Sequence, residues 1–368
     1  MKTETYTSTR QWLFRKVSSD PPSGFWRVVS APLFVLSLLY LAILKIRYFL
    51  YRVGFFPTRK LPRRVISVGN LTVGGTGKTP VVLFLTRFFQ GQGKRIAILS
   101  RGYGRIKGKE TVIVSDGREL LATAGESGEE AFFLARELKG VIVAVGKNRY
   151  RTGQQLLGKF PIDLFILDDG FQHIQLYRDT NILLIDQERP YGNGFLLPRG
   201  ELREPVASQK RASLIFLTRK GKSGDVNSMF SFENRFDMIP AYPVRFVPEC
   251  YVELQSGTKF PVDKFEKKEA LLVSGIGNPA SFRRLVEESG IRIVRELIFP
   301  DHHSYPDEDI AAIYDIARSR SADLIVTTDK DAVKLGSLGR TGARVMILRL
   351  KMETGADFPW NALNDGTI

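Results

Sequence analysis

The sequence is poor in cysteine and histidine: it has one cysteine, Cys250, and three histidines in 368 residues. A single cysteine excludes an internal disulfide and any cysteine-rich zinc or iron–sulfur site, and it is compatible with a reducing compartment. So few histidines argue against a histidine-rich metal centre. The chain also has no internal repeat and no low-complexity tract, so a repeat architecture is not expected.

Long hydrophobic runs are scarce as well. Only residues 28–44 form an uncharged apolar stretch, bounded by Arg27 and Lys45, which excludes a polytopic membrane protein. A full span needs roughly 20 apolar residues, so flanking aromatic and basic residues would have to extend this run. Basic residues on both sides favour an embedded or interfacial helix over a clean crossing. The alternative is a buried core helix, whereas a cleaved signal peptide is disfavoured because no small-residue cleavage pattern follows.

Acidic residues are outnumbered: 54 Lys and Arg against 39 Asp and Glu give a net charge of +15. This excess predicts an anionic partner, either nucleic acid, anionic lipid or a phosphorylated substrate. With 43% hydrophobic and 25% charged residues, the composition is that of a folded globular chain. The length predicts two compact domains, since a domain usually holds about 100 to 200 residues.

From residue 64 onward, short β-branched runs alternate with longer amphipathic stretches, a pattern typical of an α/β fold with a parallel sheet. The expected strands of the first part are residues 63–69, 95–100, 141–146, 162–169, 181–186 and 213–218. Those of the second part are residues 269–275, 291–297, 323–329 and 344–350, with helices starting near Pro279 and Pro306. Gly, Ser, Asn and Pro interrupt the rhythm over residues 221–248, so the domain boundary is placed there.

The strongest local signal is a glycine-rich turn, TVGGTGKT, between an expected strand and an apolar helix. Glycines let backbone N–H groups converge on phosphate oxygens, and the helix N-terminus adds a positive dipole. Lys78 can reach the β and γ phosphates, and Thr79 can ligate Mg²⁺. The consensus has glycine at the position of Thr72, but the strand-to-helix context compensates for this difference. The alternative is a glycine-rich turn with a solvated lysine, which would not explain why Lys and Thr directly follow the last glycine. The expected ATP-binding residues are Thr72, Val73, Gly74, Gly75, Thr76, Gly77, Lys78 and Thr79.

A metal partner for this loop is expected at the end of the apolar run 162–169, which closes with Asp168 and Asp169. A carboxylate there can hold Mg²⁺ beside Thr79, directly or through water. Adjacent aspartates at a strand end often only cap a turn. The nucleotide loop upstream favours the metal-binding interpretation.

Histidines and glutamates supply candidates for proton transfer. His173 lies in DDGFQH, and His302 and His303 lie in FPDHHSYPDED, where a carboxylate could orient an imidazole as a proton acceptor. The alternative for this second cluster is capping of the helix that follows. Glutamates 126, 129 and 130 fall at an expected helix start, where the dipole favours carboxylates in any case.

Arginines cluster in glycine-rich loops at expected strand ends, where ligands bind in such folds, and their guanidinium groups suit phosphate. The candidate substrate-binding arginines are Arg101, Arg149, Arg178, Arg199 and Arg203.

Eight motifs occur in order along the chain: VGNLTVGGTGKTP, LSRGYGR, GKNRYR, LDDGFQHIQLYRD, GNGFLLPRGELREP, SGIGNPASF, FPDHHSYPDEDI and TTDKDAVKL. With them, and with its N-terminal apolar segment, the chain resembles the tetraacyldisaccharide 4'-kinase family of lipid A biosynthesis over nearly its whole length. The resemblance implies transfer of the ATP γ-phosphoryl group to the 4'-hydroxyl of a tetraacyl glucosamine disaccharide 1-phosphate, giving lipid IVA, with Mg²⁺ as cofactor. It implies a kinase at the cytoplasmic face of the inner membrane of a Gram-negative bacterium. The expected partners are the lipid substrate and membrane lipids, without nucleic acid or an obligate protein.

The sequence pattern and the resemblance together predict the organisation of the chain. It comprises a tail (1–22), a membrane-associated helical segment (23–56), a P-loop kinase domain (57–220), a linker region (221–264) and a smaller C-terminal α/β domain (265–368). The tail has no counterpart in the family.

Site roles follow from the same resemblance. It makes Asp168 and Asp169 the Walker B pair and pairs His302 with an acidic residue that activates the sugar hydroxyl. That acidic residue lies in the family's Gly-Asp-Glu motif, here Gly128, Glu129 and Glu130, so glutamate replaces aspartate at Glu129; alignment onto Gly125 and Glu126 is the alternative. The role of residues 329–331 stays open, because Asp329 stands where the family has glutamate. The expected catalytic residues are Lys78, Glu129 and His302, and the expected metal ligands are Thr79, Asp168, Asp169 and Glu130.

Two rival functions fit part of the sequence. A membrane-tethered P-loop ATPase acting as a switch or positioning factor would share the loop and the anchor, but it gives no reason for the DHH motif or the arginine-rich loops. A nucleic-acid-dependent ATPase would explain the positive charge. It is disfavoured because basic residues flank the apolar segment and no basic stripe with interleaved aromatics occurs.

Overall fold

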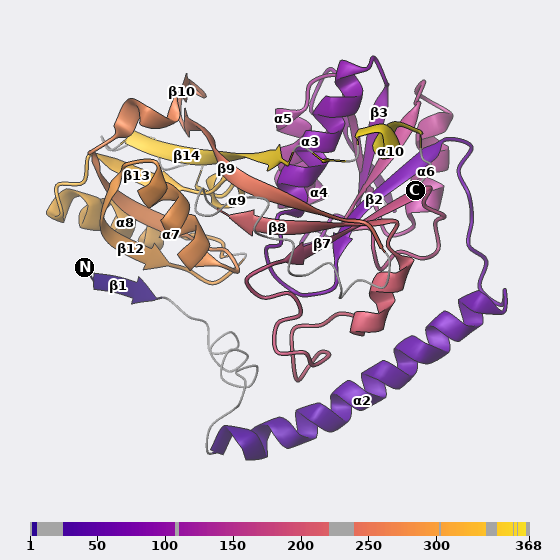
Figure 1. Ribbon diagram of the computed structural model, residues 1–368. Helices are drawn as coiled ribbons and strands as arrows, with labels where there is room; N and C mark the ends of the chain where they lie inside the picture. Colours follow the sequence, from indigo (N-terminus) through magenta and orange to yellow (C-terminus); the bar gives the residue numbers. More distant parts are fainter. Residues whose placement is uncertain are drawn as a thin grey trace. The chain divides into compact units, whose positions relative to one another are not determined.

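The computed structural model describes residues 2–5, 25–106, 110–220, 239–301, 303–335, 344–355, 357–358 and 360–365. The chain divides into two compact units, and each contributes a run of neighbouring strands. The larger unit comprises the described residues of Lys16–Arg219, Asp225–Val244 and Thr354–Ile368, and the smaller unit is mainly Arg245–Glu353 together with the first strand. Figure 1 shows the elements of both units, with colours that follow the sequence from the N-terminus to the C-terminus.

The larger unit is built on a mostly parallel sheet with strand order β8-β7-β2-β6-β3-β5-β4. Its strands are β2 (Arg64–Asn70), β3 (Ile96–Ser100), β4 (Thr111–Asp116), β5 (Ile142–Gly146), β6 (Leu164–Asp168), β7 (Thr180–Asp186) and β8 (Leu214–Lys220). Its helices are α2 (Phe25–Arg52), α3 (Lys78–Gly91), α4 (Ala124–Ser127), α5 (Glu129–Glu137), α6 (Arg149–Leu157) and α10 (Trp360–Asp365). Only the edge strand β4 runs antiparallel to its neighbour β5. The expected strands are confirmed, and β4 was missed.

Helices cover both faces of this sheet. Alternate strand residues, among them Val65, Leu99 and Phe165, pack with Leu156 of α6 in one buried cluster. Helices α3 and α5 contact the strands from the other side, with Val81, Val82 and Leu85 of α3 fully buried. This layered arrangement is that of a nucleotide-binding α/β domain, and it places the carboxyl ends of β2, β3 and β6 at one edge of the sheet.

The smaller unit is a second α/β sandwich, as expected, with strand order β1-β12-β11-β13-β14-β9. Its strands are β1 (Lys2–Thr5), β9 (Ala241–Glu253), β10 (Lys259–Phe260), β11 (Glu269–Ser274), β12 (Arg292–Ile298), β13 (Leu324–Thr327) and β14 (Arg344–Thr354). Its helices are α7 (Pro279–Glu288), α8 (Asp307–Ser319) and α9 (Asp329–Ala332). Leu272 of β11 packs in the cluster on the α7 side and Leu271 in the cluster on the α8 side, so these two helices cover opposite faces.

Two features of the chain path stand out. Strand β9 lies inside the range expected to be a linker, and its residues up to Val244 belong to the larger unit. The residues from Thr354 onward also group with the larger unit, where Phe358 and Trp360 pack against Phe84 of α3.

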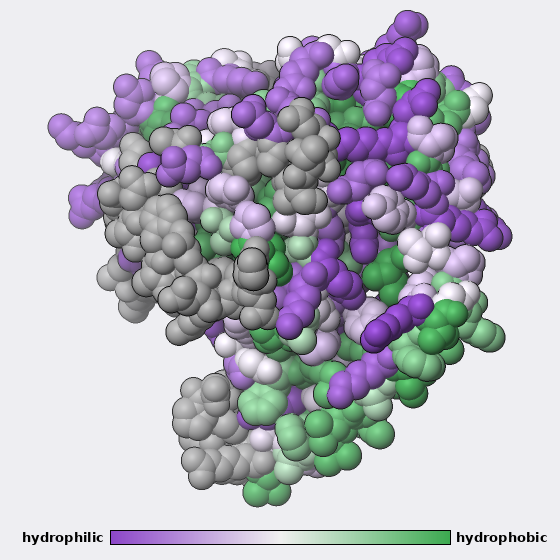
Figure 2. Space-filling view, turned by 45° about the vertical axis from the view of Figure 1, so that its right-hand side comes forward, coloured by the Kyte–Doolittle hydropathy of each residue, from purple (hydrophilic) through white to green (hydrophobic). Residues whose placement is uncertain are grey.

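Helix α2 is long and apolar enough to cross a membrane by length and composition, and only 11% of its most apolar window is buried. Its buried face carries Leu44, which packs with Phe171 and Leu196 of the larger unit. The opposite face exposes Leu39, Ile43, Ile46 and Phe49, with Ile43 61% exposed. Figure 2 shows hydrophobic side chains, in green, gathered in the lower part of the view, at the height at which α2 is drawn in Figure 1. The buried-core alternative therefore does not describe α2.

Candidate phosphate-transfer site

The glycine-rich loop lies between the carboxyl end of β2 and the N-terminus of α3, as the sequence predicts. Gly74 has φ of +120° and Gly77, which caps α3, has φ of +85°. These backbone conformations are rare for residues with a Cβ, so both positions require glycine. The start of the loop is fixed by neighbours: the Val73 N–H donates to the Glu201 carbonyl at 2.8 Å, and Thr72 forms an antiparallel bridge with Leu202.

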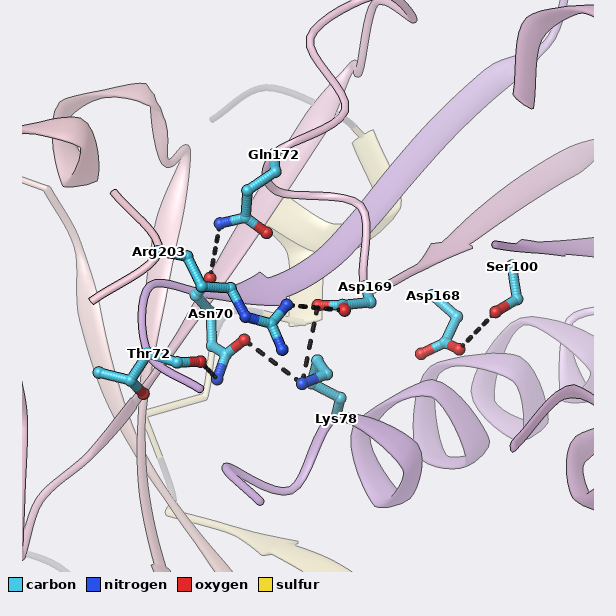
Figure 3. A network of polar contacts seen from close by, with 8 residues as sticks. All are labelled: Asn70, Thr72, Lys78, Ser100, Asp168, Asp169, Gln172 and Arg203. Atoms are coloured by element: carbon cyan, nitrogen blue, oxygen red, sulfur yellow. Dashed lines mark hydrogen bonds and ion pairs between the residues drawn. The ribbon is translucent and has the colours of Figure 1, made fainter. Parts of the chain in front are cut away.

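Lys78, the first residue of α3, points into the site. Its Nζ lies 3.3 Å from Oδ1 of Asn70 and 3.7 Å from Oδ1 of Asp169, and its side chain is only 11% exposed (Figure 3). Asn70 in turn donates from Nδ2 to the Thr72 carbonyl at 2.8 Å. The lysine is therefore held at the helix N-terminus in a polar network, the place where a nucleotide loop needs a cation.

The two adjacent aspartates lie in opposite electrostatic environments. Asp168 ends β6, is 1% exposed and accepts a hydrogen bond from Ser100 Oγ at 3.0 Å. Burial raises its pKa to about 7, and the nearby carboxylates of Glu130 and Asp169 add to this. Burial acts on Asp169 in the same direction, but Lys78 and Arg203 outweigh it and lower the pKa of Asp169 to about 2.

Asp169 has a left-handed backbone, with φ of +49°, which is uncommon for a residue other than glycine. Its Oδ2 accepts from Nη1 of Arg203 at 2.8 Å. The loop after it is packed tightly, because a Cβ at Gly170 would lie 2.6 Å from Ser67 Oγ. Strain at a strand end next to paired charges is typical of functional sites.

The donor set fits a magnesium ion. Oxygen atoms are available from Asp168 and from the hydroxyl group of Ser100, and the raised pKa of Asp168 reflects a buried negative charge that a cation would stabilise. Within the described part of the chain, no three His, Cys, Asp or Glu side chains form a ready metal cage.

The three candidate glutamates differ in what they contact. Glu126 accepts hydrogen bonds from the backbone N–H and the hydroxyl of Thr123, so it closes a capping box at the start of α4. Glu129 and Glu130 open α5 and are half-buried. Glu130 is close enough to Asp168 to raise the pKa of that carboxyl. All three lie in the first turn of α4 or α5, as the helix-start alternative predicted.

The structure separates the five candidate arginines into two groups. Arg203 binds Asp169, and Arg149 is buried near both aspartates, which stabilise its charge against the burial that lowers its pKa to about 10. Arg101 follows Ser100 at the end of β3, is exposed, and is close enough to Arg149 to act on it electrostatically. Arg178 and Arg199 instead belong to the packing under α2.

Arg178 and Arg199 both contact neighbouring residues of the larger unit. Arg178 donates from Nη1 to the Phe171 carbonyl at 3.2 Å. Arg199 is 6% exposed, lies over the ring of Phe195 at 4.6 Å, and its backbone N–H donates to Ser37 Oγ.

Several residues of the network were not singled out from the sequence. They are Asn70, Ser100 and Gln172, of which Gln172 donates from Nε2 to the Asn70 carbonyl at 2.9 Å (Figure 3). Asn70 and Ser100 are the last residues of β2 and β3. The rule that ligands bind at the carboxyl ends of parallel strands would have pointed to both.

The FPDHHSYPDED loop belongs to the smaller unit, and His302 lies outside the described residues. The neighbouring His303 stacks on Phe299 and its Nε2 lies 2.5 Å from Oδ2 of Asp309, at the start of α8. His303 thus contacts a side chain in the first turn of α8, and within the described residues no side-chain hydrogen bond caps that helix.

Residues 328–331 hold the base of this loop. Lys330 Nζ contacts Asp301 at 2.7 Å. The buried carboxylate of Asp331 accepts from the Tyr305 hydroxyl, the Thr328 hydroxyl and the Gly275 N–H, at 3.0, 2.7 and 3.0 Å. These contacts give the TTDKDA motif a role within the smaller unit that the sequence had left open.

Comparisons with known proteins agree on one family. The family described as tetraacyldisaccharide-1-P 4'-kinase matches residues 29–365. The tetraacyldisaccharide 4'-kinase of Pelobacter propionicus is 41% identical over 317 residues, 86% of each chain. That of Geobacter metallireducens is 40% identical over 319 residues, 86% of this chain and 92% of the relative. Among solved structures, LpxK from Aquifex aeolicus, crystallised in complex with ATP, is 34% identical, with a TM-score of 0.73 over 91% of this chain and 98% of its own.

Proposed function

The chain belongs to the tetraacyldisaccharide-1-P 4'-kinase family, and we propose that it transfers the γ-phosphoryl group of ATP to the 4'-hydroxyl of a tetraacyl glucosamine disaccharide 1-phosphate. The product is the 1,4'-bisphosphate lipid IVA. The observation that carries this proposal is the position of Lys78, held at the N-terminus of α3 between Asn70 and Asp169. A glycine-rich loop, a helix N-terminus and a fixed lysine together form a binding site for nucleotide phosphates.

In the proposed reaction, residues 72–79 bind the phosphates through their backbone N–H groups and through Lys78. The 4'-oxygen forms a bond to the γ-phosphorus, while the bond from that phosphorus to the β–γ bridging oxygen breaks and ADP leaves. Such transfer depends mainly on positioning and on neutralising charge. Lys78 supplies one positive charge, and Arg203, fixed by Asp169, supplies a second beside it.

The proposed magnesium ligands are Thr79, Asp168, Asp169 and Glu130. Asp168 is the best placed of these, because its carboxylate is buried and accepts a hydrogen bond from the Ser100 hydroxyl and from no other side chain of the described residues. Asp169 contacts Lys78 and Arg203. We therefore propose that it acts on the magnesium site indirectly, by holding these two cations in place. When bound, Mg²⁺ neutralises negative charge that develops on the transferred phosphoryl group.

For the acceptor, we propose Glu129 as the residue that takes the proton of the 4'-hydroxyl. Glu126 is committed to capping α4, which favours Glu129 over the alternative alignment. A base of this kind contributes a rate factor of about 10² to 10⁴. The assignment of His302 as its partner stays a prediction, because that residue is outside the described part of the chain.

We further propose that α2 attaches the enzyme to the cytoplasmic face of the inner membrane. The exposed face of α2 carries large apolar side chains, and the segment that follows is basic, with Arg52, Arg59 and Lys60. Apolar burial and attraction to anionic lipid act together in interfacial attachment. The lipid substrate would lie in the same membrane surface as α2. Arg101 and Arg149 are the candidate contacts for its phosphorylated sugar.

The rival function, a membrane-tethered switch ATPase, predicts a different response to substrate. We would measure ADP release from the detergent-purified full chain with Mg²⁺ and ATP, with and without the tetraacyl disaccharide 1-phosphate. Strong stimulation by the glycolipid, with one phosphorylated lipid per ADP, supports the kinase. Hydrolysis that is indifferent to the glycolipid supports the switch.

A further inference from the structure

Helix α2 presents two unlike faces. The exposed face is apolar, whereas the face toward the larger unit carries Ser37, Tyr40, Leu44 and Arg47, which the spacing of three and four residues places in one stripe. The three polar members of this stripe all donate hydrogen bonds to backbone carbonyls. Ser37 Oγ donates to Leu196 at 2.8 Å, Tyr40 OH to Arg203 at 2.9 Å and Arg47 Nη2 to Gln172 at 3.1 Å.

The Tyr40 contact leads directly to the phosphate loop. Its acceptor, Arg203, binds Asp169 through its side chain and donates its backbone N–H to the Leu71 carbonyl at 2.7 Å. Leu71 immediately precedes the glycine-rich turn. Arg203 is therefore the single residue that connects Tyr40 of α2 with Asp169 and with the start of the loop.

The Arg47 contact leads to Lys78 by a second route. Its acceptor, Gln172, donates from Nε2 to the Asn70 carbonyl, and Oδ1 of Asn70 accepts from Lys78 (Figure 3). The two routes start at different turns of α2 and meet at the ion pair of Lys78 with Asp169.

We propose that Tyr40 and Arg47 are positioning residues, through which α2 fixes the geometry of Lys78, Asp169 and Arg203. The helix is then part of the phosphate site's framework as well as an anchor, and its seating in a lipid surface is coupled to binding of the nucleotide phosphates. This inference rests on the proposed function, since it takes Lys78 and Asp169 as the groups that handle the nucleotide. A misplacement of about 1 Å at the reacting groups can cost about 10²-fold in rate, so loss of one anchor hydrogen bond is enough to alter the site.

The test compares variants that remove a hydrogen bond with matched controls on the same helix. Tyr40→Phe deletes one hydroxyl, and Tyr51→Phe is its control. Arg47→Met removes the donor and one positive charge, and Lys45→Met removes the same charge from the exposed face of α2. The full chain is assayed in mixed micelles for kcat, KM for ATP and KM for the lipid. Its binding to vesicles of phosphatidylethanolamine with anionic phosphatidylglycerol is measured in parallel.

We expect Tyr40→Phe and Arg47→Met to lower kcat/KM for ATP by about 5- to 50-fold relative to their controls, with vesicle binding and KM for the lipid unchanged. A fluorescent ATP analogue titrated without lipid gives a second readout. Arg47→Met should weaken binding of the analogue to the otherwise native protein. It should have no further effect when Lys78→Ala is already present, because both substitutions act on one network. Kinetic constants for ATP within about twofold of the controls, or a change confined to KM for the lipid, would overturn the inference.

Failure of the proposed function would look different. If Lys78→Ala bound the nucleotide analogue and turned over like the native enzyme, the phosphate loop itself would be wrongly assigned. If Lys78→Ala is inactive while Tyr40→Phe and Arg47→Met behave as their controls, only the positioning role of α2 is lost.

Discussion

Asp168 and Asp169 are neighbours in the chain, yet the first accepts from the hydroxyl of Ser100 and the second from the guanidinium of Arg203. The left-handed backbone of Asp169 turns the two carboxylates to different partners. Their pKa values move apart, toward about 7 and about 2. One carboxylate is thus left to receive a cation, while the other organises the cations that the protein itself provides.

Substitutions of these two residues should affect stability in opposite directions. In magnesium-free buffer near pH 8, we expect Asp168→Asn to raise the free energy of unfolding by about 1–3 kcal/mol, because it removes a buried charge close to Glu130 and Asp169. Asp169→Asn should lower it by about 1–3 kcal/mol, because Lys78 and Arg203 lose their counter-charge. Chemical denaturation of both variants checks this. If both variants are less stable than the native protein, the buried charge of Asp168 does not lower the free energy of unfolding. Both variants are expected to be inactive.

Lys78→Ala should reduce turnover by at least about 10³-fold, since it removes the positive charge that we propose binds the nucleotide phosphates. The fold should persist, because the lysine contacts only polar groups of the site. Lys94→Ala, at an exposed position before β3, is the control. Circular dichroism establishes the fold and a phosphorylation assay the activity; substantial turnover in Lys78→Ala would refute its assigned role.

The glutamates at the start of α4 and α5 can be separated by matched substitutions. Glu129→Gln is expected to lower kcat by about 10² to 10⁴ with little change in KM for ATP. Glu126→Gln should leave kcat unchanged and stability nearly so, because glutamine at this position can still accept the hydrogen bonds of Thr123 in the capping box. The reverse pattern would assign the base to Glu126.

The two adjacent histidines should also divide their roles. We expect His302→Ala to lower turnover more than ATP affinity, and His303→Ala to lower stability, because His303 stacks on Phe299 and contacts Asp309. Turnover and the midpoint of thermal unfolding distinguish them. Near-normal turnover in His302→Ala would remove that residue from the mechanism.

His173 provides a pH dependence. Burial, with Arg149 nearby, lowers the pKa of this imidazole from 6.5 to about 3. Between these pH values the unfolded chain binds the extra proton and the folded chain does not, so the free energy of unfolding falls as pH is lowered from 6.5 toward 3. His173→Gln lacks this contribution, and the native protein should lose on the order of a few kcal/mol more than the variant over this range. Equal slopes in denaturation series at several pH values would contradict the burial of a neutral histidine.

Much of the α/β core could be predicted because its strands are short β-branched runs, such as residues 162–169, that end in polar residues. Strand β4 was missed, since TVIVSD is an edge strand with a half-buried, mixed pattern. The glycine-rich loop was predictable because glycine, lysine and threonine carry their chemistry within a few residues of sequence.

The contacts around the loop could not be predicted, because they join segments far apart in the chain. Nothing in the sequence distinguishes Tyr40 or Arg47 from other residues of an apolar helix, yet they contact residues 203 and 172. Conversely, Arg178 donates to the Phe171 carbonyl and Arg199 lies over the ring of Phe195, contacts that their loop motifs did not announce. Long-range hydrogen bonding, which decides both cases, leaves no local pattern.

The central claim is tested most directly by the product. The full chain in detergent, supplied with Mg²⁺, ATP and a tetraacyl disaccharide 1-phosphate, is incubated and its lipids are analysed by tandem mass spectrometry. The account predicts a bisphosphorylated lipid with the new phosphate on the 4'-oxygen, absent with Lys78→Ala. Hydrolysis of ATP without that product, or phosphate at another hydroxyl, would contradict it.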